Sequence, residues 1–156
     1  MKWNKHVLDV CCGLRAMWFN KEHPNVIYHD KRYREAGFDD FRPNFKITPD
    51  VQGDWKNLPW PDNTFKHVVM DPPHIISTED SHRMVKYYGH LEKETWREEI
   101  KAGFDECMRV LDDYGTLVFK WSEVSIKKKE LLSVLETEPM YGHPNGSKIP
   151  CHWLLL

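Results

Sequence analysis

The sequence VLDVCCG, residues 7–13, decides the fold. Its apolar residues form a short run that ends at a turn of small residues, which is typical of a buried strand. At such a turn, a ligand can approach the backbone at the carboxyl edge of a sheet. The stretch therefore predicts a first buried strand over residues 6–10 and a binding turn at Gly13.

The rest of the chain alternates short apolar runs with helical patterns, which predicts an α/β fold with a mainly parallel sheet. Apolar residues recur every three or four positions over residues 96–111, which indicates a helix with one buried face. Ser125 is placed to cap the next helix. We expect a short helix over residues 15–22 and a turn over residues 142–147. Strands are expected at residues 26–28, 51–53, 65–70, 116–121 and 151–156.

The length and charge of the chain limit its organisation and its partners. With 156 residues it is long enough for one domain with a real core, so residues 1–156 are expected to form a single domain. Lys and Arg number 22 and Asp and Glu 24, a formal charge of -2. Proteins that grip duplex nucleic acid usually have a basic excess, so the overall charge argues against tight, free-standing DNA binding. A local basic patch would still suffice for a nucleic-acid substrate.

The cysteines and the hydropathy pattern favour a soluble, cytoplasmic protein with reduced thiols. Cys11 and Cys12 are neighbours that point to opposite faces of a strand, so a bridge between them is not expected. No CxxC pair occurs and the histidines lack the spacing of metal ligands, so no metal site is expected. There is no signal peptide and no apolar run of about 18 residues, so no membrane association is expected. The oligomeric state is not indicated.

Two acids lie at or just after the ends of predicted strands. Asp30 ends the second strand, 17 residues after Gly13, where an acid can accept hydrogen bonds from ribose hydroxyls. A solvated loop aspartate is the alternative interpretation. The stretch GDWKNLPWPDNTF, residues 53–65, follows the third strand. There Asp54 suits an amino donor and Trp55 the face of a flat base, although a simple turn-containing loop is also compatible.

A reaction site is predicted at Asp71-Pro72-Pro73-His74, directly after the strand over residues 65–70. The two prolines fix the backbone, which favours a carboxylate that orients a reacting group. His74 can stack on a ring or exchange a proton near neutral pH. The alternative is a stiff exit from the strand with a capping aspartate.

The first motif resembles that of class I methyltransferases that depend on S-adenosylmethionine. The family motif reads DxGxGxG, and Asp9 and Gly13 match it. Cys11 replaces the first glycine, and Arg15 replaces the third, where it either crowds the cofactor or points away from it. Cysteine is small, so a tight turn is still compatible with the sequence.

Three later runs resemble the same family, in the same order along the chain. Residues 54–65 are similar to the family run DxxxLPFxDxxF. Residues 71–74 are similar to the Asp/Asn-Pro-Pro-aromatic motif of enzymes that methylate exocyclic amino groups. Residues 103–119 resemble the helix, turn and fifth strand of the family. The LDVCCG and DPPH runs are most similar to small phage or bacterial methyltransferases.

The resemblance implies a Rossmann-like fold: a mainly parallel sheet flanked by helices, with a C-terminal antiparallel hairpin. It implies S-adenosylmethionine as the cofactor and an amino nitrogen as the methyl acceptor, with a DNA or RNA nucleobase as the first substrate class. Asp71 and the region of the Pro72 carbonyl would orient the amino group, and Pro73 and His74 would complete the site, with His74 stacking. The residues implied in cofactor binding are Asp9, Cys11, Gly13, Asp30, Asp54 and Trp55.

Other functions remain open at this point. A methyltransferase for a small molecule or a protein side chain would contain the same motifs. A non-catalytic binding module with this fold is supported by the altered glycine pattern at Cys11 and Arg15. A dinucleotide oxidoreductase is disfavoured because no GxGxxG occurs. The polar segment over residues 75–95 is either a lid over the substrate or a surface loop.

Overall fold

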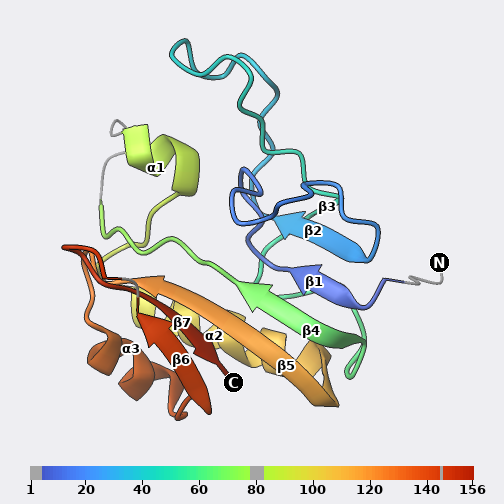
Figure 1. Cartoon of the computed structure of the whole chain (residues 1–156), viewed down its shortest axis with the longest axis vertical. Coiled ribbons are helices and arrows are strands. Elements are labelled where there is room, and N and C mark those ends of the chain that lie inside the picture. Colours follow the sequence, from blue (N-terminus) through green and yellow to red (C-terminus); the bar gives the residue numbers. More distant parts are fainter. Residues whose placement is uncertain (1–4, 78–82, 145) are drawn as a thin grey trace.

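A central sheet of seven strands organises the protein (Figure 1). The computed structural model describes residues 5–77, 83–144 and 146–156. The strands are β1 (Val7–Asp9), β2 (Val26–Asp30), β3 (Val51–Gln52), β4 (Phe65–Met70), β5 (Leu111–Ser122), β6 (Tyr141–Pro144) and β7 (Cys151–Leu155). They lie in the order β3-β2-β1-β4-β5-β7-β6, and the first five are parallel. Strand β7 is antiparallel to both β5 and β6. The fold is therefore a Rossmann-like α/β fold, as the sequence predicts.

Two helices cover one face of this sheet. They are α2 (Trp96–Val110) and α3 (Lys128–Leu135), which contact each other (Figure 1). The apolar stripe predicted for α2 is confirmed, because Ile100 and Phe104 are buried in one core cluster with Met70 and Phe119. This layer contains most of the buried apolar side chains, which makes it the main source of hydrophobic stabilisation.

The opposite face is closed by turns over the first half of the sheet. The helix predicted over residues 15–22 is wrong, because the structure has only turns and bends there. Arg15 has a left-handed backbone, with φ of 52°, which interrupts a helical path. Trp18 instead packs edge-on against Tyr28, with ring centroids 5.6 Å apart, and so covers part of β2.

Three boundaries differ from the sequence prediction. Ser125 does not cap α3, because its hydroxyl accepts a hydrogen bond from the Ile76 amide at 3.1 Å. The first amide of α3 is bonded by Glu123 instead, at 3.3 Å. Strand β5 begins directly after α2 rather than at residue 116. The turn predicted over residues 142–147 is wrong at its start, where β6 pairs with β7 and satisfies its backbone groups.

A third helix, α1 (Arg83–Tyr88), lies in the polar segment after the predicted reaction site. Part of that segment, residues 78–82, lies outside the described residues. None of the described helices is both long and apolar enough to cross a membrane. The cysteines Cys11, Cys12, Cys107 and Cys151 are thiols rather than disulfides, as expected.

Candidate active site

Four acids gather at the carboxyl ends of neighbouring parallel strands. Asp9 and Asp30 are the last residues of β1 and β2, Asp54 follows β3, and Asp71 follows β4. The strand order reverses between β1 and β4, and open α/β sheets bind ligands in the crevice at such a point. The structure therefore brings the predicted cofactor and reaction motifs to one sheet edge.

Asp9 is the most buried of these acids, with 1% of its surface exposed. Its Oδ2 accepts a hydrogen bond from Trp18 Nε1 at 2.7 Å, and its Oδ1 accepts one from the Cys11 amide at 3.3 Å. Burial raises the pKa of Asp9 to about 7, and the charges of Asp71 and Asp30 add to the rise. The carboxyl therefore takes up a proton far more readily than an ordinary aspartate.

The turn after β1 contains two left-handed residues, Gly13 with φ of 47° and Arg15 with φ of 52°. Arg15 thus adopts a left-handed backbone, which is the conformation that favours glycine. Its side chain donates to the carbonyls of Lys21 and Thr48 at 2.7 and 2.8 Å. Its guanidinium also lies 3.8 Å from the centre of the Tyr28 ring. Arg15 therefore points away from the acidic edge and leaves it uncrowded.

Asp30 fastens this turn to β2. Its Oδ2 accepts from the Gly13 amide at 2.8 Å and from Arg32 Nη2 at 3.2 Å, while its Oδ1 accepts from Arg32 Nε at 3.1 Å. The side chain is only 4% exposed. Both oxygens are engaged within the chain, so Asp30 has a clear role in shaping the turn. Arg32 was not predicted; its only sequence signal is its position two residues after Asp30.

The loop after β3 is anchored to α2. Trp55 lies against the helix at Gly103, where a Cβ would be 3.3 Å from the indole Cδ1. Glu106 accepts a hydrogen bond from the Leu58 amide at 2.8 Å. Arg109 donates to the carbonyls of Leu58 and Trp60 at 3.0 and 2.9 Å.

This anchoring pair was not singled out from the sequence, although an acid and a base three residues apart on a helix are a recognisable signal. Because Glu106 and Arg109 hold the loop, Asp54 at its start stays accessible, with a side chain that is 40% exposed. Its Oδ1 accepts from the Lys56 amide at 2.9 Å. Among the described residues, Oδ2 has only the Lys56 ammonium as a partner, 3.6 Å away.

Asp71 is paired with a lysine from the neighbouring strand. Lys120 Nζ donates to Asp71 Oδ2 at 2.7 Å, and the carboxylate side chain is 21% exposed. His74 stands edge-on to Trp121, with ring centroids 6.3 Å apart. Burial lowers the pKa of His74 below its ordinary value, against the opposing effect of the Asp71 charge. His74 is therefore neutral at pH 7.

The segment after α1 lies directly against the reaction motif. Gly89 has φ of 77°, and a Cβ at this position would lie 3.1 Å from Pro73 Cγ. Arg32 Nη1 donates to the Tyr87 carbonyl at 3.0 Å, which ties α1 to Asp30. The segment around Tyr87 and Gly89 thus connects the turn after β1 with the predicted reaction site.

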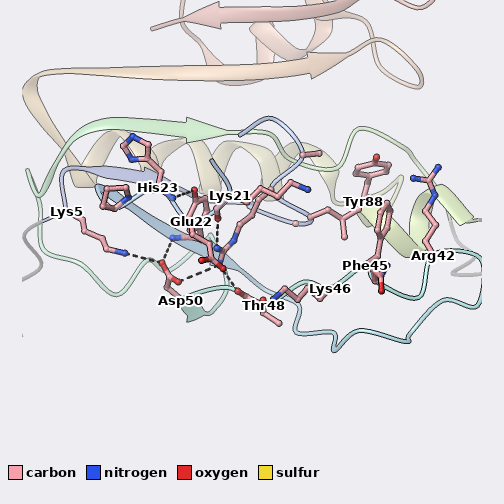
Figure 2. Close-up of a pocket in the computed structure, with 17 residues that line it drawn as sticks. Lys5, Lys21, Glu22, His23, Arg42, Phe45, Lys46, Thr48, Asp50 and Tyr88 are labelled. Carbon is pink, nitrogen blue, oxygen red and sulfur yellow. Dashed lines mark hydrogen bonds and ion pairs between the residues drawn. The ribbon is translucent and has the colours of Figure 1, made fainter. Parts of the chain in front are cut away.

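A cavity lies beside this edge rather than on it. It has a volume of about 700 Å³ and is lined mainly by the loops around residues 13–24 and 42–50 (Figure 2). Of the residues predicted to bind cofactor or substrate, Gly13 alone lines it. The cavity is therefore separate from the acids, with the turn at Gly13 between them.

Comparison with known proteins supports the fold assignment. No protein-family model and no curated protein sequence matches the chain. The PH0226 protein from Pyrococcus horikoshii OT3 is similar in structure, with a TM-score of 0.56 and 15% identity over 96% of this chain and 79% of that one. A SAM-dependent methyltransferase from Leishmania major gives a TM-score of 0.56 and 12% identity over 96% and 63%. The chain therefore has the class I fold found in SAM-dependent methyltransferases.

Proposed function

We propose that the protein transfers the methyl group of S-adenosylmethionine to an amino nitrogen, with a nucleobase as the first substrate class. The observation that carries this proposal is Asp71. Its carboxylate is held by Lys120 at 2.7 Å, is followed by two prolines, and lies at the point where the strand order reverses. A fixed, partly exposed acceptor at this point is suited to orient an N–H donor.

The acidic edge fits the charge of the cofactor, which has a positive sulfonium and a positive amino group. Asp30, Asp54 and Asp71 each have a Lys or Arg partner, whereas Asp9 has none among the described residues. We assign Asp54 to the adenine amino group, because its side chain is 40% exposed and its Oδ2 has no hydrogen-bond donor among the described residues, only the Lys56 ammonium 3.6 Å away. Asp9, Cys11, Gly13, Asp30 and Trp55 would form the remainder of the site.

When bound, the cofactor supplies an activated methyl group. Asp71 would accept a hydrogen bond from the target amino group and so hold its nitrogen in place, and the proton released on methylation would leave along this hydrogen bond to the carboxylate and solvent. Lys120 fixes the carboxylate while this occurs. His74, neutral at pH 7, offers an uncharged ring for stacking on the base. In-line displacement depends on such alignment, so positioning is the main contribution of the chain.

Isothermal calorimetry with S-adenosylhomocysteine tests the cofactor assignment. The native protein is expected to bind, and Asp54→Ala to bind at least tenfold more weakly, because the assigned acceptor is gone. Asp113→Ala, an exposed aspartate beyond α2, serves as the matched control and is expected to bind like the native protein. Absence of binding by folded native protein would overturn the enzyme assignment and favour a non-catalytic module.

Transfer of a radiolabelled methyl group then tests the substrate class. RNA, DNA and nucleosides are offered beside small amines and a protein mixture. Transfer to nucleosides or nucleic acids supports the proposal, and Asp71→Ala is expected to abolish it. If the methyl group were transferred only to small amines or to proteins, the assignment of a nucleobase as the acceptor would be wrong, and the same site would act on a different class of substrate.

A further inference from the structure

The 700 Å³ cavity lies on the face of the sheet opposite α2 and α3, where turns replace helices. This cavity, the basic groove, is elongated in Figure 2. Lys5 and Asp50 mark one end, and Arg42, Phe45 and Tyr88 the other. Its size is within the range of pockets that hold small ligands or ligand segments.

Positive charge is concentrated in the basic groove, although the whole chain has a formal charge of -2. Five Lys or Arg residues line it against two acids. Lys5 and Arg15 are both 3.6 Å from Asp50, which offsets part of their charge. The other three cations, Lys21, Arg42 and Lys46, form no ion pair with any described acid. They are therefore available to an anionic ligand.

Aromatic rings lie at the same end of the groove as one of these cations. Arg42 is placed over the Phe45 ring, 4.8 Å from its centre, and Tyr88 is 39% exposed. Cations that contact phosphates, combined with rings that stack on bases, are the features by which proteins bind single-stranded nucleic acid. A duplex would keep its bases stacked and would leave these rings unused.

The aromatic end of the groove adjoins the predicted reaction site. Tyr88 is followed by Gly89, the residue whose backbone lies against Pro73. The segment at Tyr88 and Gly89 therefore links the aromatic end of the groove to the loop that contains Asp71. This continuity distinguishes the groove from an isolated anion site.

We propose that the basic groove binds the phosphodiester backbone of a single-stranded nucleic acid and delivers an adjacent base to Asp71. The inference rests on the proposed function, because it names the substrate that the site would take. Lys21, Arg42 and Lys46 contact phosphates, and Tyr88 stacks on a base beside the target. Residues of the groove are then expected to affect the KM for methyl transfer to the strand, because they contribute to its binding.

Fluorescence anisotropy with labelled 12-nucleotide DNA and RNA strands tests the proposal at several salt concentrations. The variant Lys21→Gln/Arg42→Gln/Lys46→Gln is compared with Lys127→Gln/Lys128→Gln/Lys129→Gln, which removes three positive charges at the start of α3 instead. The groove variant is expected to bind about tenfold more weakly or worse. Its slope of log Kobs against log salt concentration is expected to be shallower by about two, because three phosphate contacts are lost at about 0.7 each. The control is expected to bind like the native protein. Tyr88→Ala tests stacking without a change of charge.

Each outcome has a defined meaning. The inference would be overturned if the native protein bound neither the DNA nor the RNA strand at low salt. It would also be overturned if the folded groove variant and the Tyr88→Ala protein both bound the strands as tightly as the native protein does. Competition by a mononucleotide at equal concentration would restrict the ligand to a free nucleotide and would also overturn it. Failure of the proposed function is recognised separately, by absent binding of S-adenosylhomocysteine or by absent methyl transfer to free nucleosides.

Discussion

Lys120 Nζ and Asp71 Oδ2 lie 2.7 Å apart at the ends of two neighbouring strands. The register of β4 and β5 explains this contact. Met70 pairs with Phe119, so the residues that follow them, Asp71 and Lys120, are neighbours and point together to the other face of the sheet. The ion pair is therefore fixed by the sheet itself. It places a preoriented carboxylate at one end of the row of four acids, beside Asp9 on the neighbouring strand.

Lys120→Met is expected to lower kcat/KM for methyl transfer about 10- to 100-fold, because the lost charge-assisted hydrogen bond is worth about 1.5–3 kcal/mol. Affinity for S-adenosylhomocysteine is expected to change little, since Asp54 is untouched. Steady-state kinetics and calorimetry measure the two quantities. Lys120→Arg is expected to restore part of the rate, and Lys129→Met, an exposed control, to leave it unchanged. Native-like turnover in Lys120→Met would show that the ion pair does not position Asp71.

Asp9 is expected to make the protein less stable as the pH rises. Its pKa is about 7 in the folded protein, whereas an unfolded aspartate has a pKa of about 3.9. The folded state binds more protons between these values, so the free energy of unfolding falls as pH rises through that window. Relative to Asp9→Asn, the native protein is expected to lose roughly 2 to 3 kcal/mol between about pH 5 and pH 8.

Urea unfolding at both pH values measures this difference. Histidines and other groups titrate in both proteins, so their contributions cancel in the comparison. The asparagine keeps an oxygen that can accept the hydrogen bond from Trp18. Parallel stability curves for the two proteins would contradict a raised pKa at Asp9.

Arg109→Met is expected to lower the free energy of unfolding by about 2 kcal/mol, because two loop carbonyls and Glu106 lose their donor. It is also expected to weaken cofactor binding, since the loop that starts at Asp54 loses its anchor. Arg97→Met, on the same helix, removes an exposed pair with Glu130 and is expected to cost less than about 1 kcal/mol. Equal unfolding midpoints for the two variants would argue against the anchoring role.

A comparison of Gly89→Ala with Gly37→Ala distinguishes the effect of backbone strain from the effect of a contact with the reaction motif. Both glycines have positive φ, 77° and 91°, so both variants are expected to lose about 1–2 kcal/mol of stability. A Cβ at Gly89 meets Pro73 at 3.1 Å, whereas one at Gly37 meets nothing within 4 Å. Only Gly89→Ala is therefore expected to lower kcat for methyl transfer, as measured at saturating cofactor. A similar kcat in both variants would show that Pro73 tolerates the displacement.

The acids at the sheet edge could be predicted because each follows an apolar strand, and parallel strands bring their carboxyl ends together. Their partners could not. Lys120 is 49 residues from Asp71, and this contact exists only because β5 lies beside β4. The turns between β1 and β2 were misread as a helix because the left-handed backbone of Arg15 has no local sequence signal. The basic groove could not be predicted either, because the residues that line it come from loops that are separate in the sequence.

Because the helices cover only one face of the sheet, the molecule is expected to have one rigid half and one more mobile half. Amides in α2, β4 and β5 are hydrogen-bonded within a large core and are expected to exchange slowly with deuterium, whereas the turns around residues 13–24 and 42–50 are expected to exchange quickly. The acidic edge lies at the boundary between these halves. Ligand binding can therefore order the adaptable half without disturbing the rigid one, so occupancy of the edge and occupancy of the groove are expected to reinforce each other.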